Sequence, residues 1–228
     1  MMTENKRTAS QQEIEKKQVA GIGLAIVMID PSRNGDNISN PVLWTNRELK
    51  AKKYTERVIG QITIPSDTRK KGERGFSNVL GTLAEFSADD ELIKSLHFVR
   101  GSSYFRSKIW IRDNPFDFAV LIIDRPITDV ITPVDVNEVM PNGWMSLEEL
   151  RSKDSSEVRS FIGQVIGGVT SRSVISDVVD NYLKFPEKRI PLSKFLPQNF
   201  SIAEFFNKRE KLADMIGNSG VIYESKRQ

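Results

Sequence analysis

One apolar run near the start of the chain sets the strongest limit on the fold. Residues 19–29 read Val-Ala-Gly-Ile-Gly-Leu-Ala-Ile-Val-Met-Ile and stop at Asp30-Pro31. A bilayer span needs about 20 apolar residues, and no small-residue cleavage pattern follows this run. The run therefore predicts a β-strand buried on both faces, with no membrane segment and a cytoplasmic location.

Further along, strand signals alternate with a helix signal. Strands are expected at 42–45, 58–64 and 116–123, with a loop over 30–41. Residues 76–86 carry one apolar stripe at helical spacing, formed by Phe76, Val79, Leu80 and Leu83. Elements mixed in this order favour an α/β or α+β sandwich.

Composition excludes several kinds of site. The 228 residues contain no cysteine, so disulfides, thiolate zinc sites and cysteine nucleophiles are excluded. The single histidine, His97, excludes multi-histidine metal sites, and its apolar neighbours predict a packed strand residue. Residues 163–168 lack the G-x-G-x-x-G spacing and there is no Walker loop, which disfavours Rossmann and P-loop enzymes.

Residues 47–74 are locally basic, with nine bases against four acids. One interpretation is an anionic partner such as a phosphorylated ligand or RNA. The other is a charged surface between strands. Only Trp44, beside this stretch, and Tyr54, within it, supply aromatic rings, which are too few to indicate binding of single-stranded nucleic acid.

Two acids at the end of the expected helix form a candidate metal site. Glu85 and Asp89 are four residues apart and share a face if the helix continues. Carboxylates are the ligands that Mg²⁺ prefers. The alternative is a solvated helix end.

Helical signals dominate after residue 146. Ser146 is placed to cap a turn over 147–150, and apolar residues at helical spacing fill 174–183 until Pro186. Ser201 and Glu204 have the spacing of a capping box. The helix expected to follow has an apolar side formed by Ile202, Phe205, Phe206, Leu212 and Ile216. Gly217 is placed to end it. Residues 1–18 predict a mobile tail.

Several of these segments together resemble the Nudix family. That family has the box G-x5-E-x7-R-E-U-x-E-E-x-G-U, where U is a bulky apolar residue, after a strand and a proline. Here Pro65 and the box positions Glu73, Leu83 and Glu85 match. Residues 138–150, with Glu138-Val139 and Trp144-Met145-Ser146-Leu147-Glu148-Glu149-Leu150, resemble the family's ending.

The resemblance implies an α/β class fold, a Nudix-like α/β/α sandwich with a mixed sheet. It would cover residues 19–152, and residues 153–228 would form a helical C-terminal extension.

The departures from the family pattern bear on function. The resemblance implies metal carboxylates at 82, 85 and 86 and an arginine at 81, but the chain has Thr82, Phe86 and Gly81, so only Glu85 remains. One glutamate holds Mg²⁺ or Mn²⁺ weakly. Glu73 and Asp89 are the residues that would compensate, and Glu73 and Glu85 would be catalytic only in an active enzyme.

We therefore expect a Nudix-fold protein with a degraded metal site that binds a phosphorylated nucleotide-type ligand or a partner without hydrolysing it, as a sensor or regulator. The alternatives are a divergent Mg²⁺-dependent hydrolase of nucleoside diphosphates linked to another group, and a structural subunit of a complex. Residues 153–228 would serve a homodimer or protein partner, and their excess of bases permits nucleic acid without demanding it. The candidate phosphate contacts are Arg47, Arg69, Lys70, Lys71 and Arg74.

Overall fold

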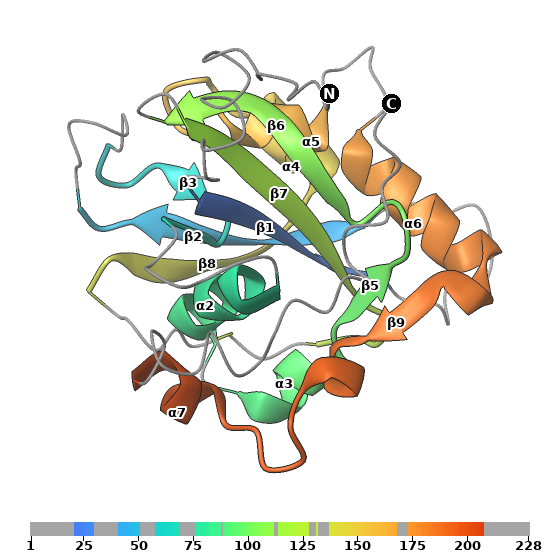
Figure 1. Cartoon of the computed structure of the whole chain (residues 1–228). Helices are drawn as coiled ribbons and strands as arrows, with labels where there is room; N and C mark the ends of the chain where they lie inside the picture. Colours follow the sequence, from blue (N-terminus) through green and yellow to red (C-terminus); the bar gives the residue numbers. More distant parts are fainter. Residues whose placement is uncertain are drawn as a thin grey trace, which may run out of the picture.

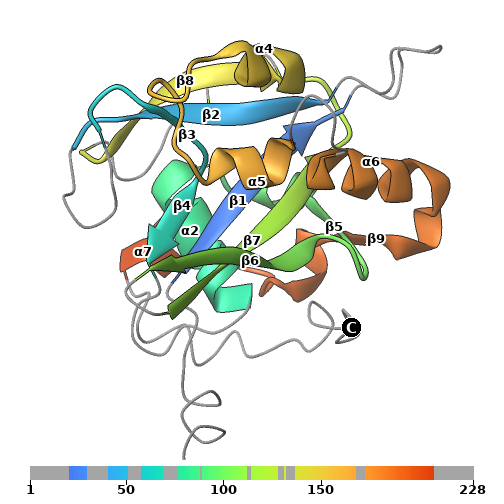
Figure 2. The same ribbon diagram turned by 90° about the horizontal axis from the view of Figure 1, so that it is seen from above.

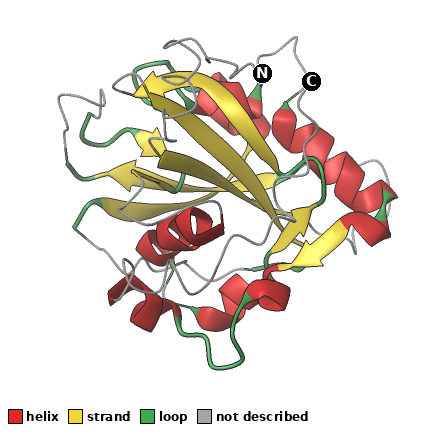
Figure 3. Cartoon of the chain, viewed as in Figure 1, coloured by secondary structure: helices red, strands yellow, loops and turns green. Residues whose placement is uncertain are grey.

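In the computed structural model, a mixed sheet lies between two layers of helices (Figures 1 and 3). The structure describes residues 21–29, 41–50, 58–68, 76–87, 89–111, 114–127, 131, 137–167 and 173–207. The predicted α/β class and mixed sheet are confirmed. The expected tail at 1–18 lies outside the described residues.

The strands are β1 (Gly21–Met28), β2 (Val42–Glu48), β3 (Ile62–Thr63), β4 (Ser66–Thr68), β5 (His97–Val99), β6 (Tyr104–Ile111), β7 (Asn114–Ile123), β8 (Val139–Ser146) and β9 (Arg189–Pro191). The α-helices are α2 (Phe76–Phe86), α3 (Asp90–Ser95), α4 (Leu147–Ser152), α5 (Ile162–Ile166), α6 (Val174–Lys184) and α7 (Ile202–Asn207). Two short 3₁₀ helices are η2 (Pro186–Lys188) and η3 (Leu192–Phe195).

Strand β1 is the centre of the sheet. The main path runs β3-β2-β1-β7-β5-β9, while β4 pairs with β1, β6 with β7 and β8 with β2. β1 and β7 are parallel over the whole of β1, from Gly21 opposite Phe116 to Met28 opposite Ile123. The other edge of β1 changes partner, from β4 at Gly21–Gly23 to β2 at Val27 and Met28.

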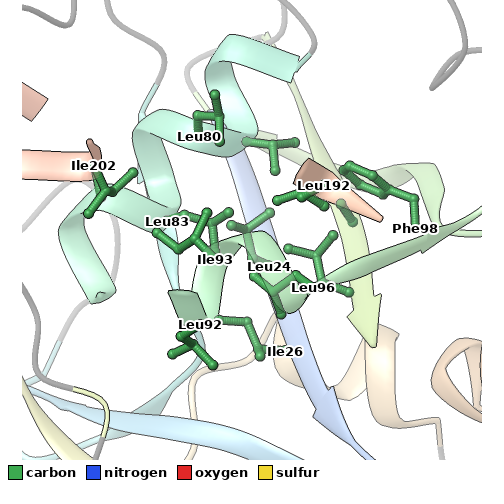
Figure 4. Packing of buried hydrophobic residues seen from close by; sticks show 14 of the residues in the cluster. Leu24, Ile26, Leu80, Leu83, Leu92, Ile93, Leu96, Phe98, Leu192 and Ile202 are labelled. Carbon is green, nitrogen blue, oxygen red and sulfur yellow. The ribbon is translucent and has the colours of Figure 1, made fainter. Parts of the chain in front are cut away.

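β1 is buried on both faces, as the sequence predicts. Ile22, Leu24 and Ile26 join a core cluster with α2, α3 and α7, which Figure 4 shows from close by. Ala25 and Val27 join a second cluster with α4, α5 and α6 on the opposite face (Figure 2). The two-residue period of a strand thus supplies both cores from one segment.

The expected helix at 76–86 is confirmed as α2, with its apolar stripe in the first cluster. The expected strand at 58–64 is shorter. A turn occupies 59–60, where Gly60 has φ +87, and only Ile62 and Thr63 pair with β2. A residue with positive φ cannot continue an extended strand, so the pairing starts after the turn.

The C-terminal part contributes to the same sheet and clusters as the region before residue 152. β9 pairs with β5, α6 packs in the second cluster, and α7 packs against α2 in the first. The Ser201 hydroxyl accepts the Glu204 N–H at 3.4 Å at the start of α7, which is one of the two hydrogen bonds of the predicted capping box. Leu212, Ile216 and Gly217 lie outside the described residues. None of the described helices has the length and apolar character of a membrane span.

His97 is a half-buried residue at the start of β5, as predicted. Its ring meets the Tyr182 ring edge-to-face, with centroids 5.7 Å apart. The Tyr182 hydroxyl donates to Asp124 at 2.6 Å, which ties α6 to the end of β7. Burial and the Asp124 carboxylate raise the pKa of Tyr182.

Substituting Gly23 tests the β1–β7 register. An added Cβ would lie 2.5 Å from Cε1 of Phe118, a fully buried ring. We expect Gly23→Ala to lower the free energy of unfolding by about 1–3 kcal/mol, because overpacking forces neighbours to move. The measurement is urea denaturation. Gly163→Ala is the matched control: open space surrounds this helical position, so a change of no more than about 1 kcal/mol is expected. Equal effects of the two substitutions would contradict the packing.

Candidate functional site

The change of partner along β1 opens a wedge in the sheet. β2 diverges from β1 after Leu43, while β4 pairs with the beginning of β1. α2 packs on the face of the sheet that carries Ile22, Leu24 and Ile26. A small pocket, with an empty volume of about 260 Å³ that includes open solvent, lies in this wedge. Its lining residues come from β2, β3, β4, α2 and the start of β8: Glu48, Thr63, Ser66, Glu85, Phe86, Glu138 and Val139.

Two positions of α2 lack the carboxylates that the family resemblance implies. Thr82 is fully buried, and its hydroxyl donates to the Asn78 carbonyl of its own helix at 3.0 Å. Phe86 is buried and presents an apolar ring to the pocket. Glu85 is half-buried at the pocket wall. Of the three implied ligand positions on α2, only Glu85 has a metal-ligating side chain.

Three glutamates line the pocket, but they come from three separate elements. Glu48 is 1% exposed, and its Oε1 accepts from Nη1 of Arg159 at 3.0 Å. The Arg159 guanidinium also lies 4.4 Å from the centre of the Phe161 ring. Within the described residues, no group of three or more acids or histidines is arranged to hold a metal ion. The residues described here therefore do not fit a Mg²⁺ site.

Beside the pocket, the same face of β2 carries unusual hydrogen-bond donors. Trp44, Asn46 and Glu48 alternate onto the face that α2 covers, and Asn46 lies opposite Thr63 of the pocket. Trp44 is paired with Trp144 of β8, with ring centroids 5.2 Å apart. Nδ2 of Asn46 and Nε1 of both tryptophans are buried and have no hydrogen-bond partner in the described part of the chain.

These donors matter because leaving a buried polar group unsatisfied costs about 1–3 kcal/mol. Three such donors on the paired strands β2 and β8, next to a pocket, would be stabilised by a hydrogen-bond acceptor from outside the chain. That acceptor is either ordered water or a ligand oxygen or nitrogen.

The residues predicted from the sequence are distributed unevenly. Glu85 lines the pocket. Arg47 lies on the other face of β2, where its Nε donates to Oδ1 of Asn142 at 2.8 Å and its Nη1 donates to the Gly60 carbonyl at 2.9 Å. Its guanidinium thus joins β2, β8 and the turn before β3. Five candidates fall outside the described residues: Arg69, Lys70, Lys71, Glu73 and Arg74.

Asp89 does not share a helix face with Glu85, so that expectation is wrong. α2 ends at Phe86, and Asp89 is the exposed N-cap of α3, where its carboxylate accepts the N–H groups of Glu91 and Leu92. The chain bends away because an N-cap residue has an extended backbone. Asp89 is also not among the residues that line the pocket.

Sequence reasoning missed Glu48 of the pocket lining and the polar and aromatic residues beside the pocket. Glu48 and Arg159 are 111 positions apart, and no local pattern connects them. Asn46 and Trp44 carry one retrospective signal, since polar and aromatic residues two apart share a strand face. Their lack of partners becomes visible only in the folded chain.

Comparisons with known proteins give low similarity. No protein-family model and no curated protein matches the chain. Among solved structures, a NUDIX hydrolase from Nitrosomonas europaea is 13% identical, with 79% of this chain and 97% of that chain covered and a TM-score of 0.41. A C. elegans Ap4A hydrolase binary complex is 11% identical, covering 75% and 98%, with a TM-score of 0.42.

A third structure, the T. brucei MERS1–RNA complex, is 16% identical, covering 88% of this chain and 64% of that chain, with a TM-score of 0.39. These scores are too low to assign the chain to a family. The α/β sandwich described above therefore rests on the sheet topology and the two core clusters.

The buried pair of Glu48, which lines the pocket, and Arg159 gives a direct test of the packing beside the pocket. Removing one partner leaves a buried charge without its counter-ion, so Arg159→Met should lower the free energy of unfolding by about 3–5 kcal/mol in urea denaturation. The double variant Glu48→Gln with Arg159→Met removes both charges and should recover most of this loss. A double variant no more stable than Arg159→Met alone would contradict the assignment.

Proposed function

We propose that the chain is a Nudix-like protein that binds a phosphorylated nucleotide-type ligand without hydrolysing it, in a sensing or regulatory role. The observation that carries the proposal is the set of buried donors on Trp44, Asn46 and Trp144 beside a pocket where the described residues form no metal-ligand cluster. Donors of this kind complement the ring nitrogens and carbonyl oxygens of a nucleobase.

The charge of the pocket indicates which end of such a ligand would bind where. Three acids and no bases stand among its lining residues, and one of the acids is paired with Arg159. A phosphate group without a bound cation is repelled by this lining. We therefore assign the neutral end of the ligand to the three buried donors on β2 and β8. We assign the phosphate to the basic residues Arg69, Lys70, Lys71 and Arg74.

The side chains on α2 support the proposal that the ligand is not hydrolysed. Activating water next to a diphosphate requires a metal held by several anionic oxygens. Thr82 turns its hydroxyl into the helix and Phe86 offers no oxygen. A second candidate, the divergent Mg²⁺-dependent hydrolase, is favoured only by the three glutamates at the pocket, and the experiment below separates the two.

The test measures binding and turnover in the same samples. The protein is incubated with nucleoside mono- and diphosphates and nucleoside-diphosphate sugars, in Mg²⁺, Mn²⁺ or EDTA. We expect one ligand class to raise the Tm in all three conditions, with no product released. Asn46→Leu should lower the affinity for that ligand by about tenfold or more, because one good hydrogen bond is lost. Asn181→Leu is the matched control, because α6 packs on the face of the sheet opposite α2.

Two results would overturn the proposal. Metal-dependent turnover that Glu85→Gln abolishes would assign a hydrolase. No thermal shift with any ligand, together with co-purification in a defined complex, would assign a structural subunit.

A further inference from the structure

Exposed apolar side chains gather at one corner of the sheet. Among the described residues, five large hydrophobic side chains are exposed, and four of them lie at the end of β2: Leu49 (37%), Val58 (55%), Ile59 (65%) and Met140 (45%). We call these four the apolar corner. The fifth, Phe185 (38%), follows α6 and lies elsewhere in the fold.

Backbone hydrogen bonds hold the apolar corner together. The Leu49 N–H donates to the Glu138 carbonyl at 2.9 Å, and the Gly60 N–H donates to the Glu48 carbonyl at 2.8 Å. The end of β2 is thus flanked by the 58–60 turn on one side and by the start of β8 on the other. Figure 1 shows this edge, where the arrowhead of β2 points away from α6.

Along the sequence, the charges next to the apolar corner are mostly positive. Lys50 is exposed directly after Leu49. In the sequence, residues 50–57 join Leu49 to Val58 and contain four bases, Lys50, Lys52, Lys53 and Arg57, against the single acid Glu56. Glu48 and Glu138, the acids next to the corner along the chain, line the pocket. An occupant of the corner therefore presents apolar groups together with negative charge.

Three occupants fit these features poorly. A second copy of the chain brings the same positive charge into a twofold contact, where like charges repel. Single-stranded nucleic acid is bound by stacking on aromatic rings, and all four corner side chains are aliphatic. Protein–protein interfaces are depleted in lysine and enriched in aromatic residues, the opposite of this corner.

We propose that the apolar corner binds the surface of an anionic lipid bilayer. Aliphatic side chains at a turn enter the boundary between headgroups and acyl chains, and lysines that follow in the sequence, beginning with the exposed Lys50, attract anionic lipid headgroups. Such a contact lies on the membrane and needs no spanning segment. It is independent of the ligand proposed for the pocket, because Arg47 and Met140, which pair across β2 and β8, are on the face opposite Glu48 and Val139.

Vesicle co-sedimentation tests this surface. The full chain is mixed with vesicles of phosphatidylcholine alone or of phosphatidylcholine with phosphatidylserine. We expect binding to the anionic vesicles only, and less binding as salt screens the charges. Ile59→Ser should reduce the partition coefficient about tenfold or more, because burying an isoleucine side chain contributes a transfer free energy of that size. Phe185→Ser is the matched control and should bind like the wild type.

A second variant guards against a folding defect. Ile59 is the most exposed of the four, so Ile59→Ser should keep the wild-type Tm. Val58→Ser should lose vesicle binding to the same extent. No binding to anionic vesicles at low salt, equal binding to both vesicle types, or wild-type binding by both serine variants would each overturn the proposal. A dimer that Ile59→Ser converts to a monomer, without vesicle binding, would instead assign the corner to a second copy.

Discussion

The structure depends on the parallel pairing of β1 with β7. Eight consecutive residue pairs join these strands, and both strands are buried on their two faces. Parallel strands buried in this way require a covering layer on each side. The layer of α2, α3 and α7 and the layer of α4, α5 and α6 meet that requirement, and each takes alternate side chains of the same two strands.

The pocket follows from what happens at the other edge of β1. A central strand that exchanges one neighbour for another partway along leaves a wedge between the two, here between β2 and β4. α2 closes one side of the wedge and the β2–β8 pair forms the other. This geometry brings Glu85 into one pocket with residues from distant parts of the chain, among them Glu48, whose partner is Arg159. Buried donors on β2 and β8 then make this the polar part of an otherwise apolar layer.

Much of the fold was predictable where a local pattern has one physical solution. The run at 19–29, the stripe at 76–86 and the cap at Ser146 were confirmed as β1, α2 and the capping box of α4, in which Ser146 and Glu149 exchange hydrogen bonds. The candidate site was less predictable. Glu85 lines the pocket, but Asp89 caps α3, because the spacing argument assumed a helix that in fact ends at Phe86. The apolar neighbours of His97 predicted a strand at β5, whereas strand β9 had no strong pattern, since three residues carry too little periodicity.

The amino-acid sequence alone determines that this chain has a buried central strand and an amphipathic helix at 76–86, and that Thr82 and Phe86 of this helix carry no carboxylate. These are properties of residue type and of spacing within a few turns. Only the tertiary structure decides that Glu48 meets Arg159, that Asn46 and two tryptophans share one buried face, and that Leu49, Val58, Ile59 and Met140 meet at one exposed corner. Such contacts depend on strand order and register, and these are set by how both faces of the whole sheet are covered.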